Sequence, residues 1–351
     1  MTVNEKIAKI RTMMSANKID AVIIPSADPH MSEYFSDHWK TRAWVSGFTG
    51  SAGTFVITDK MAGLWTDGRY YVQAEKQLSG SEAVLFKASE PETPKVQEYL
   101  AKELSENAVV GINGQLFSAA YIKTMKEAFV KKNISVNGNI DFANDIWEDR
   151  PAESATEIYL LPVEYAGKSA AEKIADLRKQ LKEKDADAIT INTLDGIAWL
   201  YNIRANDVAC TPVAVAYAYV SQEKAILFTN TGRVGEEVRA NLAENGVEVC
   251  GYEEIFSMLK EIKEDTSVLC DEREMNYGLF HIMEENEKIN LIVGENPVRL
   301  MKALKNEVET KNTYEAYLQD GIAEAEFYGW LEEALEKGET VTEYQASEKL
   351  Y

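Results

Sequence analysis

The chain has three histidines, and two of them share a short polar and aromatic segment, residues 26–42. These are His30 and His38, and the same segment carries the carboxylates of Asp28, Glu33 and Asp37. Imidazole and carboxylate groups could together hold a metal ion. The spacing, however, matches neither HExxH nor a related zinc pattern. We therefore interpret these histidines, and also His281, as hydrogen-bonded structural or interface residues.

A serine between glycines, in Gly50-Ser51-Ala52-Gly53, raises the question of a nucleophile. The pattern is not GxSxG, and no histidine and aspartate accompany it at a fixed spacing. A strand beginning at Thr54, rather than a helix, follows these glycines, so they do not form a dinucleotide-binding fingerprint either. The segment is typical of a tight turn that leads into a strand.

Asp67-Gly68-Arg69-Tyr70 is typical of a helix start, with Arg69 in the first turn. An arginine there opposes the helix dipole, so we expect it to have a carboxylate partner. The partner could lie within the domain, or Arg69 could face a binding site. The later Arg204 is expected to be at least half-buried and to pair with Asp195 or Asp207.

Composition narrows the class of protein. The 351 residues are 45% hydrophobic and 27% charged, as in globular domains, and allow two or three domains. The net charge of −21 argues against nucleic acid as the main partner. No apolar run reaches the roughly 20 residues of a membrane helix, and the amphipathic N-terminus does not resemble a signal peptide. Three cysteines without CxxC spacing are expected to be buried free thiols in a reducing cytosol: Cys210, Cys250 and Cys270.

The order of predicted elements occurs twice. Each unit opens with a capping box, Thr2 to Glu5 and Ser169 to Glu172, followed by an amphipathic helix and a buried strand. The first strand is 20–24 and the second 187–191. Alternating strands and helices follow in both units, which indicates α/β layers with a mixed sheet. Unit one adds the loop 26–42, and such additions are where function tends to lie.

The character of the chain changes after Pro297. Acidic helices are predicted over 298–311 and 313–336, and the second carries an apolar stripe at helical spacing. A third capping box, Thr342 to Gln345, opens a helix that has no stop signal before the last residue. The acidic run 324–339 is interpreted as a solvated helix face. We expect the chain to be a truncated part of a longer protein.

Several segments together resemble the aminopeptidase P (Xaa-Pro aminopeptidase) family, in particular its cytosolic three-domain branch. The resemblance rests on PSADPH at 25–30, VSGFTGSAGT at 45–54, WTDGRY at 65–70, LDGIAWL at 194–200 and RLMKALKN at 299–306. It covers the whole chain. It implies an α/β fold with two tandem creatinase-type N-terminal domains, each a mixed sheet flanked by helices, at 1–155 and 156–309. Residues 310–351 would be the first helices of a pita-bread catalytic domain.

The resemblance also implies a function. The family releases the N-terminal residue that precedes proline, with two metal ions, usually manganese, held by two Asp, one His and two Glu. Those ligands would lie beyond residue 351, so we expect no metal site or catalytic residue in this chain. Its implied role is dimerisation and control of access in a cytoplasmic homodimer that acts on proline-containing peptides.

The residues expected at the access surface or subunit interface are drawn from the 26–42 loop and the WTDGRY segment. They are Asp28, His30, Glu33, Arg42, Trp65, Asp67, Arg69 and Tyr70. Two alternatives stay open: a non-catalytic module with a peptidase-like fold that binds peptides or histones, and a relative of prolidase or creatinase. The doubled N-terminal domain argues against the second, because those proteins resemble single-N-domain chains.

Overall fold

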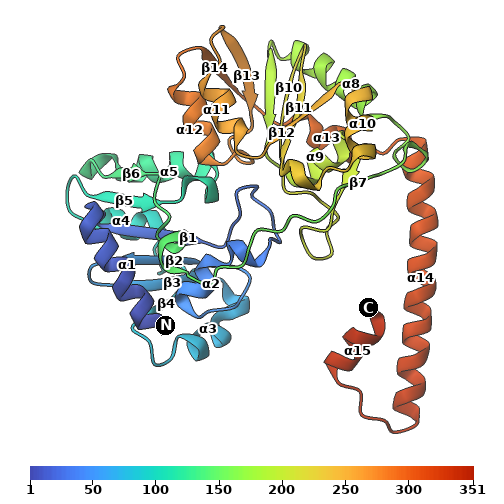
Figure 1. Cartoon of the computed structure of the whole chain (residues 1–351). Coiled ribbons are helices and arrows are strands. Elements are labelled where there is room, and N and C mark those ends of the chain that lie inside the picture. The colour runs from blue at the N-terminus through green and yellow to red at the C-terminus, as the bar shows by residue number, and fades with distance from the viewer.

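The computed structural model describes residues 1–351 and contains two six-stranded mixed sheets. We call the part built on the first sheet domain I and the part built on the second domain II. Figure 1 shows the two domains in contact, with a long helix, α14, projecting away from them and the short α15 turning back beside it. None of the helices is long and apolar enough to cross a membrane.

Domain I follows its sequence pattern closely. Its strands are β1 (Ala21–Pro25), β2 (Thr54–Thr58), β3 (Ala62–Thr66), β4 (Val84–Lys87), β5 (Val109–Ile112) and β6 (Ser135–Asn137). Its helices are α1 (Val3–Asn17), α2 (Thr41–Ser46), α3 (Tyr71–Leu78), α4 (Val96–Glu103), α5 (Ala119–Phe129) and α6 (Phe142–Ile146). The predicted capping box at Thr2 is present and begins α1.

Domain II repeats this series. Its strands are β8 (Ala188–Ile191), β10 (Tyr217–Ser221), β11 (Ala225–Thr229), β12 (Val247–Gly251), β13 (Thr266–Cys270) and β14 (Ile289–Val293). Its helices are α8 (Ala170–Glu183), α9 (Leu194–Leu200), α10 (Glu236–Glu244), α11 (Glu254–Lys260) and α12 (Tyr277–Glu285). A short ribbon of β7 (Tyr159–Leu160) and β9 (Ile203–Arg204) and the helix α7 (Val163–Ala166) lie along the connection between the domains.

The two sheets have the same topology. The first has the order β4-β3-β2-β1-β5-β6 and the second β12-β11-β10-β8-β13-β14. In the first sheet, β1–β2 and β2–β3 are antiparallel, and the remaining pairs are parallel. In the second sheet, the corresponding pairs β8–β10 and β10–β11 are antiparallel, and the remaining pairs are parallel. The predicted duplication and the mixed α/β fold are therefore confirmed.

Side-chain alternation along β1 divides the core of domain I into two layers. Val22 and Ile24 pack with Ile7, Ile10 and Met14 of α1 on one face of the sheet. Ala21 and Ile23 pack with residues of α4 and α5 on the other face. Because successive strand side chains point to opposite faces, one buried strand supports both layers. Domain II divides in the same way between α8 on one face and α11 and α12 on the other.

The structure corrects the predicted helices after Pro297. One helix, α13, spans Pro297–Ala303, and a single helix of 30 residues, α14, runs from Glu307 to Glu336. The break falls before Asn306, which forms a capping box with Glu309. This Asn-x-x-Glu pattern was the signal that the sequence analysis missed. The last helix, α15 (Glu343–Leu350), begins at the predicted capping box of Thr342.

The cysteine prediction holds only in part. All three cysteines are free, but only Cys270 is buried, Cys250 is half-buried and Cys210 is exposed. Cys210 lies outside regular strands, in the loop before β10, and has a left-handed backbone with φ 57°. The next strand, β10, begins only at Tyr217, so Cys210 has no strand beside it to bury it.

Candidate functional site

Residues 27–31 of domain I, which we call the junction loop, enter domain II beside the carboxyl end of β8. The Pro29 carbonyl accepts hydrogen bonds from the side-chain amides of Asn192, at 3.0 Å, and Asn276, at 2.8 Å. Asn192 directly follows β8, and Asn276 caps the N-terminus of α12. Because Pro29 and both asparagines are buried, the carbonyl and the amides depend on one another for hydrogen bonds.

His30 is the centre of this junction. It is 1% exposed, and both of its ring nitrogens lie at hydrogen-bond distance from domain II. Nδ1 is 2.9 Å from the carbonyl oxygen of Asn192, so it must carry a proton and donate. Nε2 is 2.8 Å from the hydroxyl of Tyr252, which donates to it. In the neutral imidazole, these contacts select the tautomer that is protonated at Nδ1.

Electrostatics agree with this assignment. Burial lowers the pKa of His30, and the nearby Asp28 carboxylate opposes that shift. Burial also raises the pKa of Tyr252 well above its ordinary value, so its hydroxyl keeps the proton that it donates. Asp28 accepts the backbone N–H groups of His30, at 3.1 Å, and Ser32, at 2.8 Å, and so fixes the turn of the junction loop.

A second contact joins the same two domains. The backbone N–H of Ala119, at the start of α5, donates to Met275 at 2.9 Å, and that of Tyr277 donates to Phe117 at 2.7 Å. The ammonium of Lys126 donates to the Tyr277 hydroxyl at 2.8 Å. Backbone bonds across a domain boundary leave little freedom for rotation, so the two domains are held at two separate points.

A pocket of about 410 Å³ lies beside the junction loop. Tyr34, Phe35 and Trp39 supply its aromatic wall, Glu33 and Arg42 supply charge, and domain II contributes Val208. The guanidinium of Arg42 is buried and donates to Ser26 Oγ at 2.9 Å and to the carbonyls of Phe48 and Gly50. Burial lowers the pKa of Arg42 to about 10. Its guanidinium therefore shapes the wall of the pocket and fixes the glycine turn.

The DGRY segment borders this pocket without lining it, because Tyr70 contacts the lining residue Ser51 and Arg69 lies near the lining residue Glu33. Asp67 caps the short helix that begins at Gly68 and accepts two hydrogen bonds from the Arg69 guanidinium, both at 2.9 Å. The expected carboxylate partner of Arg69 is thus confirmed, and it is the capping residue itself. The Tyr70 hydroxyl lies 2.7 Å from Oγ of Ser51, which lines the pocket. The Arg69 side chain is 69% exposed and free to meet another molecule.

Trp65, like the buried Asp28 and His30 of the junction loop, does not lie at the predicted access surface. It is 4% exposed, stacks on Phe86 with ring centroids 3.8 Å apart, and donates from Nε1 to the Pro94 carbonyl at 2.9 Å. Because β3 points this ring into the helix-covered face of the sheet, Trp65 is a core residue. We withdraw it from the candidate surface.

Arg204 also corrects a prediction. It is half-buried as expected, but it donates to the carbonyls of Ala198 and Ile203, both at 2.8 Å, and not to a carboxylate. The two proposed partners are engaged elsewhere, since Asp195 pairs with Lys302 and Asp207 pairs with the buried Arg233.

The histidines and acidic groups do not form a metal centre. In the structure no three His, Cys, Asp or Glu side chains come together in a way that could hold a metal ion. His38 contacts the Pro151 carbonyl at 2.7 Å, and His281 lies on the outer face of α12 near Glu284 and Glu285. The residues of this chain therefore do not fit the two-metal site that the resemblance implies.

Comparison with known proteins agrees with this architecture. A model for the creatinase/prolidase N-terminal domain matches residues 6–150, and a second model of the same description matches residues 149–309. A probable Xaa-Pro aminopeptidase P from Laccaria bicolor is 36% identical over 99% of this chain and 55% of its own length. Aminopeptidase P2 of Arabidopsis thaliana is 35% identical over 100% of this chain and 54% of its own.

One solved structure is similar over the full chain. It is described as the X-prolyl aminopeptidase of Caenorhabditis elegans, a cytosolic enzyme with a di-nuclear active site. The TM-score is 0.92 at 30% identity, and the match covers 100% of this chain and 59% of that one. The chain thus spans little more than half the length of the relatives that it matches.

The two matched models and the two sibling sheets define a tandem creatinase/prolidase N-terminal architecture. Together with the relatives aligned over the entire chain, they place it further: the chain belongs to the Xaa-Pro aminopeptidase P family.

The neutral His30 gives a prediction on stability and pH. A pKa that is lower in the folded state means that the unfolded chain binds the proton more readily. The stability that His30 contributes is therefore present above its unfolded pKa of about 6.5 and is lost as pH falls below that value. At pH 7.5, His30→Gln should cost roughly 1–3 kcal/mol, because it leaves buried partners unsatisfied.

Urea unfolding of the wild type and of His30→Gln at pH 7.5 and 5.5 measures this effect. We expect the cost of the substitution to shrink at pH 5.5, because the wild type loses stability there and the variant cannot protonate at this position. His281→Gln, at a half-buried position on α12 outside the junction, is the matched control and should change little at either pH. A cost that is equal at both pH values would show that His30 is not held neutral by the junction.

Proposed function

We propose that this chain is the non-catalytic N-terminal region of a metal-dependent Xaa-Pro aminopeptidase, which releases the N-terminal residue that precedes a proline. The observation that carries the proposal is the span of the matches: relatives with this name align with 99–100% of the chain and with only 54–55% of their own length. The C. elegans relative is described as having a di-nuclear active site.

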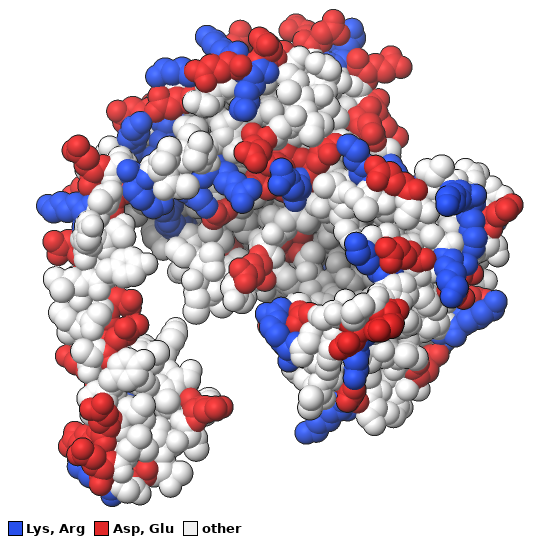
Figure 2. Space-filling model, turned by 180° about the vertical axis from the view of Figure 1, so that it is seen from behind, with Lys and Arg blue, Asp and Glu red and all other residues white.

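An unpartnered helix face supports a packing role for α14. Tyr317 and Leu318 are 71% and 62% exposed, and Ile322 is 53% exposed on the same stretch of helix. In Figure 2, uncharged atoms cover much of this projecting part of the molecule. A contiguous exposed apolar surface usually marks a contact with another protein surface. We propose that this face packs against the catalytic part of the full protein.

The two domains then act as a frame at the entrance to that catalytic part. The pocket between the 26–42 loop and Val208, with the exposed Arg69 at its rim, is the surface that we propose contacts the peptide or controls its entry. We further propose that the full protein works with manganese, in the cytoplasm, and as a homodimer. Its substrates would be peptides with proline in the second position.

The first test compares this chain with the longer protein to which it corresponds. The chain alone should release no residue from an Xaa-Pro peptide with added manganese, and titration calorimetry should show no stoichiometric manganese binding. The longer protein should release the N-terminal residue and bind manganese stoichiometrically. Light scattering on the longer protein should give the mass of a dimer. Turnover by the pure chain would contradict the proposed division, and an inactive longer protein that binds peptides would favour a binding module instead.

The second test concerns Arg69 in the longer protein. If its guanidinium contacts the peptide, Arg69→Ala should raise the Michaelis constant for long peptides about three- to tenfold, because one charge-assisted contact of roughly 1 kcal/mol is lost. The kcat for long peptides, and both kcat and the Michaelis constant for dipeptides, should stay unchanged, since such short substrates do not reach the rim. Lys60→Ala, an exposed site on the β2–β3 turn, is the matched control. An unchanged Michaelis constant would leave Arg69 with only its ion pair to Asp67.

A further inference from the structure

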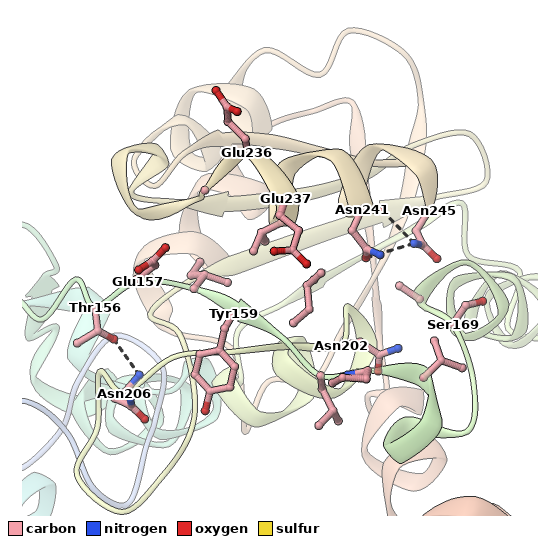
Figure 3. A pocket seen from close by; sticks show the side chains of 18 residues that line it. Thr156, Glu157, Tyr159, Ser169, Asn202, Asn206, Glu236, Glu237, Asn241 and Asn245 are labelled. Carbon is pink, nitrogen blue, oxygen red and sulfur yellow. Dashed lines mark hydrogen bonds between the residues drawn. The ribbon is translucent and has the colours of Figure 1, made fainter.

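A groove of about 870 Å³ crosses the surface of domain II, between the connecting segment 156–163 and α10 (Figure 3). Among its 18 lining residues are three glutamates and four asparagines, but no lysine, arginine or histidine. The proposed function leaves this groove without a role. Its composition favours a cationic ligand, because its walls offer carboxylate and amide oxygens and no positive charge.

One wall of the groove is an open strand edge. β7 pairs only with β9, with Leu160 opposite Ile203. The next residue, Leu161, donates its N–H to the Asn202 carbonyl at 2.8 Å. In an antiparallel ladder, hydrogen-bonded and non-hydrogen-bonded pairs alternate. The N–H and C=O of Leu160 therefore point away from β9.

The hydrogen bond of Ile158 shows to which side the free backbone groups of Leu160 point. Ile158 lies two residues before Leu160 and therefore directs its N–H to the same side. That N–H donates to the Arg233 carbonyl, at 3.1 Å, just ahead of α10. The free groups of Leu160 thus face the groove, opposite α10. Unpaired strand groups of this kind are a template for an added strand.

The carboxylates are placed to select the charge of such a strand. In Figure 3 the side chain of Glu237 points from α10 into the groove, and Glu157 lies at the end nearer Thr156. Glu236 also lines the groove, and in Figure 3 its side chain points to the opposite side of α10 from that of Glu237. Alternate side chains of an extended peptide lie on one face, about 6.6 Å apart, so basic residues at every second position could meet these carboxylates together.

We propose that this groove binds an extended peptide segment with lysine or arginine at alternate positions, which adds as a third strand to the edge of β7. The backbone of Leu160 supplies the pairing groups, and Glu157 and Glu237 supply the charge selectivity. The site is independent of the proposed peptidase role, because it uses neither the junction nor the pocket beside the 26–42 loop.

Fluorescence anisotropy with a labelled octapeptide of alternating lysine and valine tests the site on the intact chain at low salt. We expect saturable binding, and at least tenfold weaker binding of a peptide with glutamate in place of lysine. The double change Glu157→Gln with Glu237→Gln should weaken binding at least tenfold. Glu244→Gln, which removes one negative charge from the same helix at an exposed residue outside the groove lining, should change it less than twofold.

A second probe separates strand pairing from attraction of charge alone. The lysine–valine peptide with every backbone nitrogen methylated keeps its charges but cannot donate to Leu160. Its binding should be at least tenfold weaker than that of the unmethylated peptide. Equal binding of the methylated peptide, or an equal loss in Glu244→Gln and in the double variant, would overturn the proposal.

Discussion

The arrangement of the two domains depends on one buried polar contact, the junction loop of domain I against Asn192, Tyr252 and Asn276 of domain II. Each of these groups is costly to bury alone and is satisfied only by the others. The Pro29 carbonyl takes two amide donors, and His30 both donates and accepts. A hydrophobic contact could slide, but such a network has only one geometry in which all of its members are bonded. Together with the second contact, at Ala119 and Tyr277, it fixes the angle between the domains.

The arginine that follows the third strand of each domain has a different environment in the two domains. After β3, the sequence Thr66-Asp67-Gly68-Arg69 places its arginine at the surface beside Asp67. After β11, Thr229 to Arg233 places the corresponding arginine inside, where it pairs with Asp207. Asp207 also accepts from Thr156 in the connecting segment, at 2.9 Å from its backbone N–H. Burial alone would raise the pKa of Asp207, but bonds from Val215 and Arg233 outweigh this and hold the pKa below its ordinary value. The buried copy thus ties the connection to domain II, and the exposed copy is free for contacts with other molecules.

Local patterns in the sequence were sufficient to predict most of the fold. The capping boxes at Thr2 and Ser169 and the apolar runs after them gave the right helices, strands and duplication, because these features depend on neighbouring residues. The candidate site was harder. Trp65 was placed at the surface although it is in the core, since an aromatic residue on a strand does not reveal which face is covered by helices.

The residues that the sequence analysis missed are those of the partner domain. Asn192 and Tyr252 look like ordinary loop residues, and their roles arise only when a loop about 160 to 220 positions earlier folds onto them. For Arg204, the choice of a carboxylate partner failed because backbone carbonyls of α9 and β9 were nearer. Only Asn276 carried a local signal, as the cap of α12, and that signal did not indicate its second bond to Pro29.

The central claim is that the junction makes the two domains one rigid frame. Spin labels at Lys9→Cys on α1 and Lys179→Cys on α8 test it directly in the chain with Cys210 and Cys250 changed to serine, since both label sites are exposed and lie on well-packed helices. Pulsed dipolar spectroscopy at pH 7.5 should give a single narrow distance distribution. A broad or multiple distribution in the folded chain would show that the domains move independently and would contradict the account.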